Sequence, residues 1–426
     1  QEYTILLFDL YFIKVLYNYN KYNTIKNNDI ESLFFSKLIS PYLGALRSHL
    51  VIFMSISRRN FFKLAGITTA LLAMGGIGFI NQPKIGRSPK GDELAKILKS
   101  PHYVNGEFQN LEPTSVLVSK DNYYNGIKEI LFPTKGVTIP KENIPTQKTD
   151  LKALNPKENL LVWFGHSSLY LQIDGIKILV DPVFSDYASP LFFINKAFAG
   201  TNIYTANDIP DIDILIISHD HWDHLDYATI MSLKHKIKHI VCPLGVSSHF
   251  YHWGFNPDII HDEDWYREIK LSDNLKIHIL PSRHFSGRFL DNNKTLWASF
   301  AIITPTQKIF YSGDGGYSPQ FREIGDYFQG FDLAIMENGQ YNTSWAQIHM
   351  MPEEVAQATM DLQAKMLLPV HCGKFALSPH HWQDPFERIY TASQNKSYKL
   401  LTPLLGETVF LDQNNQQFNK WWTTIS

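Results

Sequence analysis

Four side chains that can bind metal occur within six positions of the sequence: His219, His221, Asp223 and His224. They directly follow Ile214–Ile217, an apolar run with the composition of a short buried strand. Histidine is the commonest transition-metal ligand, and aspartate provides a hard oxygen ligand or a base. Alternate residues of an extended segment point the same way, so the first two histidines can hold one metal and the Asp-His pair beyond them a second. The spacing predicts a metal site, with a solvated polar loop as the alternative.

A site for two metals needs more ligands than one loop provides, and strand ends are rigid enough to fix their geometry. Three further candidates each follow an apolar, strand-like run: His284, Asp314 and His371. Taken alone, one such residue is better explained as a capping or turn residue. Three residues at the same kind of position, beside a cluster of four, favour additional ligands.

The elements that must position these side chains are short strands and helices. Asp174-Gly175 separates two strand-like runs and predicts a β-hairpin turn. The strand-like runs are 160–165, 168–173, 177–180, 214–217, 239–242, 276–280, 297–303, 309–311, 333–336 and 366–370, and the helical patterns are 227–233, 246–253, 321–327 and 352–363. This order predicts a mixed α/β sandwich in which residues 155–415 form one domain.

The composition is that of an ordinary globular protein. The chain has 426 residues, of which 44% are hydrophobic, and a formal net charge of −2. No overall basic field favours nucleic acid as a partner. The two cysteines, Cys242 and Cys372, each lie in an apolar run, which predicts buried free thiols; a single disulfide is the alternative.

The segment that precedes residue 155 has several distinct parts. Met54 stands before SRRNFFK at 57–63, which resembles a twin-arginine export signal, and an apolar run follows at 64–80. We expect residues 54–86 to direct export to the periplasm or to anchor the protein on the outer face of a bacterial inner membrane; a buried helix is the alternative. We expect residues 1–53 to be a non-native or poorly structured leader. We expect residues 87–154, with a short helix at Tyr123–Phe132, to wrap around the main domain as an arm, unless they form a disordered linker.

A wider set of motifs gives the chain a resemblance to a known family. HDHWDH, followed in order by His284, Asp314 and His371, resembles the metallo-β-lactamase fold. The motifs that narrow the resemblance are WFGHSSLYLQIDGIKILVDPVFSDYASP, HFSGR, TLWASFAI, GDGGY, HMMPEEVAQA and LLPVHCGKFAL. Together they resemble the N-acyl-phosphatidylethanolamine phospholipase D family and its bacterial members, over about residues 105–400. The resemblance implies a four-layer αβ/βα sandwich.

The resemblance also implies a role for each candidate residue. The first of two zinc ions would be held by His219, His221 and His284, the second by Asp223, His224 and His371, and Asp314 would bridge both. Asp223 would orient the attacking water, and His349 matches a family histidine near the scissile phosphate. His166 and Asp181 match supporting positions, not ligands. Mammalian members have glutamine directly before the histidine that corresponds to His349. This chain has Ile348 at that position, so substrate details can differ.

The function predicted in this way is hydrolysis of a phospholipid or related phosphodiester by water activated between two zinc ions. The alternatives are a lactonase or carboxylic-ester hydrolase that resembles the ascorbate-6-phosphate lactonase branch, and a non-catalytic, membrane-tethered metal-binding protein. The apolar loop Leu191–Phe198 could contact a membrane surface or pack internally as a lid, and Arg288 could pair with phosphate or support the structure. The sequence leaves the oligomeric state open.

Overall fold

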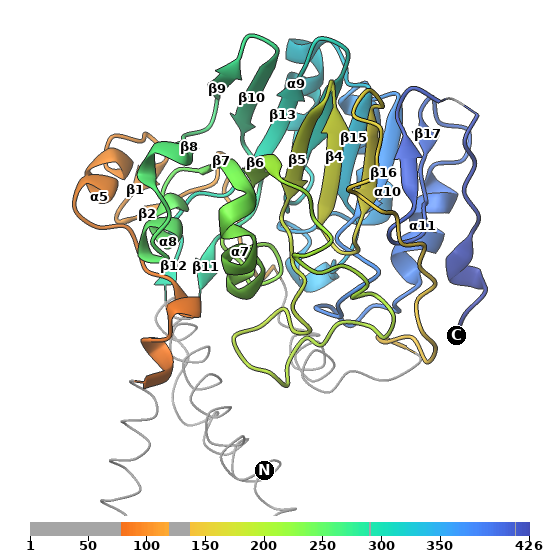
Figure 1. The fold of residues 1–426 in the computed structure, drawn as a ribbon, viewed down its shortest axis with the longest axis horizontal. Coiled ribbons are helices and arrows are strands. Elements are labelled where there is room, and N and C mark those ends of the chain that lie inside the picture. The colour runs from red at the N-terminus through yellow and green to blue at the C-terminus, as the bar shows by residue number, and fades with distance from the viewer. Residues whose placement is uncertain (1–77, 119–136, 289–290, 414) are drawn as a thin grey trace, which may run out of the picture. The chain divides into compact units, whose positions relative to one another are not determined.

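The computed structural model describes residues 78–118, 137–288, 291–413 and 415–426 (Figure 1). Residues 81–426 form one compact unit, distinct from residues 1–80. The expected leader, the twin-arginine motif with most of its apolar run, and the expected helix Tyr123–Phe132 lie outside the described residues. In the part of the chain that is described, no helix has the length and apolar character needed to cross a bilayer.

Two seven-stranded sheets form the frame of this unit (Figure 1). The first has the order β18 (Thr408–Phe410), β3 (Leu160–Trp163), β4 (Leu169–Ile173), β5 (Ile176–Val180), β6 (Ile212–Ile216), β7 (Ile237–Pro243) and β8 (Ile260–Glu263). The second has the order β17 (Lys399–Leu400), β16 (Met366–Val370), β15 (Leu333–Glu337), β14 (Lys308–Tyr311), β13 (Ser299–Ile303), β10 (Leu275–Leu280) and β9 (Arg267–Ser272). Two small hairpins pair β1 (Tyr103–Val104) with β2 (Glu107–Phe108) and β11 (Gly287–Arg288) with β12 (Asp291–Asn292).

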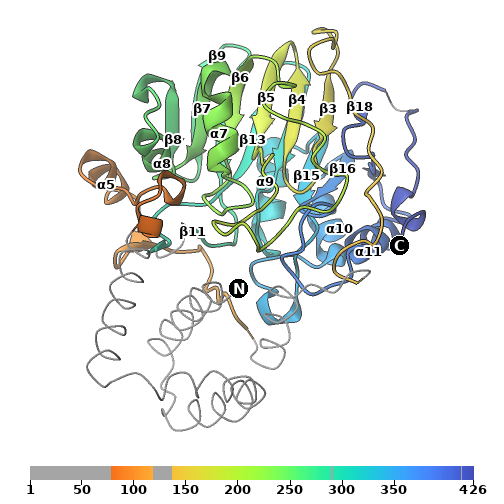
Figure 2. The same ribbon diagram turned by 60° about the horizontal axis from the view of Figure 1, so that its bottom comes forward.

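Helices cover the outer face of each sheet, which gives the four layers (Figure 2). The first sheet is covered by α7 (Tyr227–Leu233) and α8 (Ser247–His252), and the second by α9 (Gln320–Phe328), α10 (Pro352–Asp361) and α11 (Asp384–Ala392). The remaining helical elements are α5 (Asp92–Ile97), η3 (Pro83–Ile85), η4 (Lys234–Lys236), η5 (Pro257–Ile259), η6 (Thr343–Trp345) and η7 (Trp421–Thr423). The chain therefore has the predicted α/β fold and the αβ/βα layer order.

The alternation of side chains along each strand explains the layers. In β3, Leu161 and Trp163 lie in the core between the sheets, whereas Leu160 and Val162 pack under the outer helices. Successive side chains of a strand point to opposite faces, so a strand covered on both sides must be apolar at every position.

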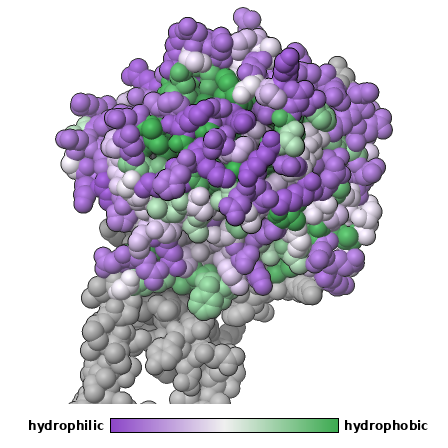
Figure 3. Space-filling view, in the orientation of Figure 1, coloured by the Kyte–Doolittle hydropathy of each residue, from purple (hydrophilic) through white to green (hydrophobic). Residues whose placement is uncertain are grey.

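The molecular surface has a different character from the core. The face seen in Figure 3 is mainly hydrophilic, and its hydrophobic residues lie in separate groups.

The strand directions bring the candidate residues to one end of the sheets. In the first sheet β5 is parallel to β6 and, through β4, runs in the same direction as β3. In the second sheet β14, β15 and β16 are parallel to one another and, through β13, run with β10. The loops that follow β3, β5, β6, β10, β14, β15 and β16 carry all the predicted site residues. Figure 1 shows the long yellow-green loop between β5 and β6 at the lower edge of the sheets.

All ten predicted strand runs and all four predicted helical patterns correspond to elements of the structure, with ends shifted by a few residues. The predicted hairpin turn is also confirmed: Ile173 pairs with Ile176, and Asp174 and Gly175 have φ of 50° and 78°. The prediction missed two helices, α5 and α11, and the short or peripheral strands β1, β2, β8, β9, β11, β12, β17 and β18. The core also extends past residue 415, because Trp422 is fully buried in it.

The described parts of the segment 87–154 pack on the sandwich. Ile97, Phe108 and Ile144 are at most 2% exposed and belong to the core between the sheets. Such burial of apolar side chains is the main favourable term that holds a chain segment in place. The segment therefore contributes to the frame on which the candidate site is built.

Candidate metal centre

The loop 218–226, which carries the HxHxDH motif, is fixed at both ends. Asp226 caps α7, since its side chain accepts the backbone N–H two residues later at 3.3 Å. The buried guanidinium of Arg288 donates through Nη1 to the carbonyl oxygens of Asp220 and Leu225, at 2.9 and 2.7 Å. Charged donors on otherwise unpaired carbonyls make strong hydrogen bonds. The loop is therefore held in one conformation that presents its histidines.

Three histidines form the first donor group. His221 Nδ1 lies 2.8 Å from His219 Nε2 and 3.4 Å from His284 Nε2. The three nitrogens all lie within 4.8 Å of one another, a spacing suited to a metal ion. Three imidazole ligands with an open position are a common arrangement for catalytic zinc.

The orientation of His284 is set by its backbone and its second ring nitrogen. Its N–H donates to Asn110 Oδ1 at 3.0 Å, and Asn110 Nδ2 donates to its carbonyl oxygen at 2.7 Å. Its Nδ1 donates to the carbonyl oxygen of Ile348 at 3.0 Å. A histidine whose Nδ1–H is used in this way leaves the Nε2 lone pair free for a metal.

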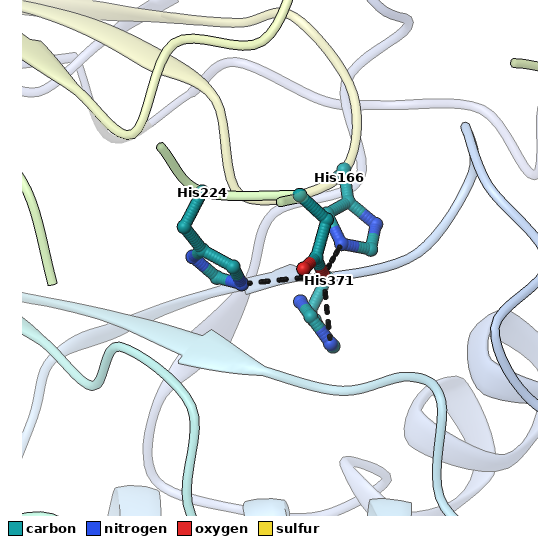
Figure 4. A group of neighbouring side chains, drawn as sticks. His166, His224 and His371 are labelled. Atoms are coloured by element: carbon teal, nitrogen blue, oxygen red, sulfur yellow. Dashed lines mark hydrogen bonds and ion pairs between the residues drawn. The ribbon is translucent and has the colours of Figure 1, made fainter. Parts of the chain in front are cut away.

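The second donor group surrounds the carboxylate of Asp223. Its Oδ2 lies 2.8 Å from His166 Nε2, 3.5 Å from His224 Nε2 and 4.0 Å from His371 Nε2. Figure 4 shows the rings of these three histidines pointing toward one another from three different loops. The four residues form a possible metal-binding group of their own.

Asp314 lies between the two groups. Its Oδ2 is 3.1 Å from His224 Nε2 and 3.8 Å from the Nε2 atoms of both His219 and His284. Its Oδ1 is 3.2 Å from His371 Nδ1. One carboxylate thus reaches nitrogens of both donor groups, which is the position of a bridging ligand.

Asp181, which is fully buried, supports the cluster from behind. Its Oδ2 accepts from His224 Nδ1 at 2.7 Å and from the hydroxyl of Tyr311 at 2.5 Å, and its Oδ1 accepts from the backbone N–H of Ser218 at 2.8 Å. A carboxylate on the outer nitrogen of a ligating imidazole fixes its tautomer and raises its basicity. His224 Nε2 is therefore the nitrogen that faces the cluster.

Three of these residues have a backbone conformation that is unusual for side chains other than glycine. His166, Asp181 and His371 have φ of 51°, 40° and 62°. Two of the loops hold each other, since His166 N–H donates to Cys372 O and His371 N–H to His166 O, at 2.9 and 3.0 Å. Such strained residues tend to gather at functional sites, where the surrounding structure compensates for their cost.

The electrostatics of the cluster favour a cation. Burial lowers the pKa of His221 to about 4, and it lowers the pKa values of His219, His284 and His371 well below their usual range. These imidazoles are therefore neutral, which is the ligating form. Burial opposes a charge on His224 as well, but the carboxylates of Asp314 and Asp223 outweigh it and raise the pKa of His224 well above its usual range. The carboxylates thus create a site that stabilises positive charge.

Two buried atoms of the cluster fit a metal ion better than any protein partner. His224 Nε2 and Asp314 Oδ1 are sealed from solvent, and their contacts with Asp314 Oδ2 at 3.1 Å and with His371 Nδ1 at 3.2 Å lack hydrogen-bond geometry. Leaving such polar atoms unpaired costs about 1–3 kcal/mol each. Coordination of a cation would satisfy both, and the mixture of imidazole nitrogen and carboxylate oxygen suits zinc as well as iron or manganese.

The cluster opens to solvent on one side. His349 and Asp223 keep 12% and 11% of their side chains exposed, whereas His219, Asp314 and His371 keep at most 2%. His349 stands just before α10, and its ring lies 5.1 Å from that of His284 and 5.3 Å from that of His371, measured between centroids. Both residues predicted to act on substrate therefore keep part of their side chains accessible to solvent.

The structure brings all seven predicted ligands into one cluster at the predicted strand ends; that they bind metal stays a prediction. Arg288 is buried and donates to backbone carbonyls, so the structural interpretation of this residue holds. Cys242 and Cys372 are buried free thiols, as expected. In the apolar loop, Phe198 is 4% exposed and Phe192 is 78% exposed, so the loop is partly packed and partly open.

Sequence reasoning missed several residues that support the cluster, namely Asn110, Ser218, Tyr311 and Glu337. Glu337 ends the apolar strand β15 and is fully buried. A carboxylate is rarely buried in this way unless it has a partner. A charged residue inside an otherwise apolar strand was the one signal that the sequence offered.

The family model described as "Beta-lactamase superfamily domain" matches residues 177–372, which include His219, Asp314 and His371. An uncharacterised protein of Mycobacterium tuberculosis is 36% identical over 328 residues, which are 76% of this chain and 88% of that protein. The chain belongs to the metallo-β-lactamase superfamily. It is a metal-dependent hydrolase of this superfamily.

Two further proteins are similar to parts of this chain. The mitochondrial N-acyl-phosphatidylethanolamine-hydrolysing phospholipase D of Saccharomyces cerevisiae is 33% identical over 302 residues, which are 67% of this chain and 63% of the yeast protein. The structure of a metallo hydrolase from the archaeon Ignicoccus hospitalis superposes with a TM-score of 0.47 and 21% identity, over 59% of this chain and 97% of that chain. The metallo-β-lactamase fold and the homology to the yeast enzyme agree with the resemblance drawn from the motifs.

Proposed function

We propose that this protein is a dinuclear zinc phosphodiesterase of the phospholipase D type, which cleaves lipids similar to N-acyl-phosphatidylethanolamine. The observation that carries the proposal is the pair of donor groups that share Asp314. His219, His221 and His284 would hold one zinc ion, and Asp223, His224 and His371 the other. Two bound zinc ions would make a water molecule between them acidic and would neutralise charge on the phosphoryl oxygens.

The chain's own residues on the open side would direct the reaction. Asp223 Oδ2 is held by His166 Nε2 at 2.8 Å, so this carboxylate has a fixed orientation from which it can accept a proton of the attacking water. His349 is also partly accessible to solvent, and its ring lies beside that of His284, so it can donate a proton to the leaving oxygen. Proton transfer by positioned side chains typically accelerates hydrolysis by about 10²–10⁴-fold.

A lipid substrate is supported by the relative from yeast and by the apolar loop. The name of the yeast protein states that it hydrolyses N-acyl-phosphatidylethanolamine, and the chain spans 63% of its length. Phe192, in the loop Leu191–Phe198, is 78% exposed, and its ring lies 5.3 Å from that of Phe193, measured between centroids. Exposed aromatic side chains of this kind can enter the headgroup region of a membrane. We propose that export through the segment 54–86 would place the protein at the inner membrane of a bacterium.

The test presents the zinc-loaded protein with N-acyl-phosphatidylethanolamine, simple phosphodiesters and lactones side by side. We expect release of phosphatidic acid from the N-acyl lipid, and no opening of lactones. The variant His221→Ala, which removes one ligand of the first group, should lose the activity together with zinc. Turnover of lactones without release of phosphatidic acid would replace this proposal by the ester-hydrolase alternative. Zinc binding without hydrolysis of any substrate would favour the non-catalytic alternative.

A further inference from the structure

Glu337 is a buried carboxylate with one imidazole partner. Its side chain is 0% exposed at the end of β15, and its Oε2 lies 2.8 Å from His349 Nδ1. Its Oε1 accepts the backbone N–H of Met350 at 2.6 Å. The carboxyl group is thus committed on both oxygens, and one of them is committed to His349.

The contact with Glu337 determines which nitrogen of His349 is available. Nδ1 is engaged with the carboxylate, whereas Nε2 makes no hydrogen bond to any residue that the structure describes. Among the described residues, Nε2 of His349 does not belong to the buried polar atoms that lack a partner, so it reaches solvent. The His349 side chain as a whole is 12% exposed. His349 therefore keeps Nε2 free of hydrogen bonds to the described residues, and Asp223 of the same cluster is likewise 11% exposed.

We propose that Glu337 is a positioning residue that holds the Nδ1–H of His349, so that Nε2–H can donate its proton to the leaving oxygen during hydrolysis. The inference rests on the proposed hydrolysis of a phosphodiester. The bond between phosphorus and the leaving oxygen breaks, with its electron pair on that oxygen, and the proton from Nε2 neutralises it. A new bond forms between phosphorus and the water oxygen, and a water proton passes to Asp223 and then to solvent. The Glu337 carboxylate remains paired with the Nδ1–H throughout.

The substitution Glu337→Gln tests this geometry with almost no change in shape. The oxygen that faces Met350 N–H must remain an acceptor, so the new amide group must place its nitrogen toward His349 Nδ1. An amide N–H cannot accept the Nδ1–H, so His349 is forced into the form with hydrogen on Nε2 alone. A neutral imidazole of this kind is a much weaker acid than one whose Nδ1–H is paired with a carboxylate.

Kinetics with two leaving groups separate positioning from a merely structural role. We expect Glu337→Gln to lower kcat by about 10²-fold on ethyl phenyl phosphate, whose leaving group needs a proton. On ethyl p-nitrophenyl phosphate, whose leaving group departs as a stable anion, kcat should be unchanged. His349→Gln should show the same selectivity, and the double variant should lose no more than either single one. Glu354→Gln is the matched control, because Glu354 accepts the neighbouring backbone N–H of Met351 at 2.8 Å and does not contact His349.

A spectroscopic readout does not depend on activity. In zinc-loaded protein labelled with ¹⁵N-histidine, the signals of His349 are assigned by comparison with His349→Gln. The wild type should have hydrogen on Nδ1, and Glu337→Gln should lose it. If the variant does not fold, the wild-type spectrum still decides, since an unprotonated Nδ1 overturns the proposal. Equal losses of kcat on both phosphates, with unchanged zinc content, would overturn it as well.

The failure of the proposed function would be seen separately. If the proposed function is wrong, the wild-type protein would cleave aryl carboxylic esters but neither ethyl phenyl phosphate nor ethyl p-nitrophenyl phosphate. In that case, the comparison of good and poor leaving groups is made on the esters, and the same selectivity decides the role of Glu337.

Discussion

Asp181→Asn is predicted to weaken binding of one metal ion without removing a ligand. Oδ2 of Asp181 accepts from His224 Nδ1 and from the Tyr311 hydroxyl, while Oδ1 accepts the N–H of Ser218. In the variant, the amide oxygen remains on the backbone N–H, and the amide nitrogen faces His224 Nδ1. The imidazole must then turn its lone pair toward the amide and its hydrogen toward the cluster. Replacement of such supporting groups typically lowers metal affinity by about 10–100-fold, which is roughly 1.4–2.8 kcal/mol.

The assay is stepwise removal of zinc by a chromophoric chelator, which resolves a weaker and a tighter site. We expect the affinity of one zinc ion to fall by this factor and that of the other to change little, because the first donor group does not contact Asp181. Asp332→Asn is the matched control, since Asp332 also accepts a backbone N–H, that of Lys308 at 2.8 Å, and lies outside the cluster. Unchanged affinities in Asp181→Asn, or an equal loss at both sites, would refute the assignment of His224 to one zinc ion.

Three further predictions follow from the described contacts. Replacement of both Phe192 and Phe193 by serine should lower turnover of vesicle-bound lipid more than turnover of a soluble phosphodiester, and equal losses would count against a role at membranes. Arg288→Met should lower the free energy of unfolding of the metal-free protein by about 3 kcal/mol in urea titrations, because two buried carbonyls lose a charged donor; a loss of substrate binding at unchanged stability would assign Arg288 to the phosphate instead. Burial lowers the pKa of Lys374 from 10.5 to about 7. Between about pH 7 and pH 10.5, Lys374 is therefore protonated in the unfolded chain but neutral in the folded protein. The free energy of unfolding should then rise with pH across that range. Lys374→Met should lack this rise, and identical pH profiles of the two proteins would contradict the assignment.

The strands and ligands were predictable where local pattern and chemistry coincide. His219, His221, Asp223 and His224 follow an apolar strand, and both features are visible within about a dozen residues. The central strands are buried on both faces, so their sequences are continuous apolar runs. The edge strand β9 was not predicted, because its exposed side carries charged residues and its sequence is therefore not a continuous apolar run. Charged residues are usual on an edge strand.

The supporting residues could not be predicted, because their partners are distant in sequence. Asn110 lies 174 positions from His284, and Tyr311 lies 130 positions from Asp181. No local periodicity records such contacts; they exist only after two sheets and their loops have assembled. Glu337 is the intermediate case, since a carboxylate inside an apolar strand requires a buried partner, but the sequence does not say which one.

The central claim is that one chain holds two metal ions on either side of Asp314. The most direct measurement is the zinc content of the purified protein, determined by elemental analysis against an accurate protein concentration, for the wild type and for Asp314→Ala. We expect two zinc ions per chain in the wild type and a clear loss of zinc in the variant. Fewer than one zinc ion per chain in the wild type, after reconstitution with zinc, would contradict it.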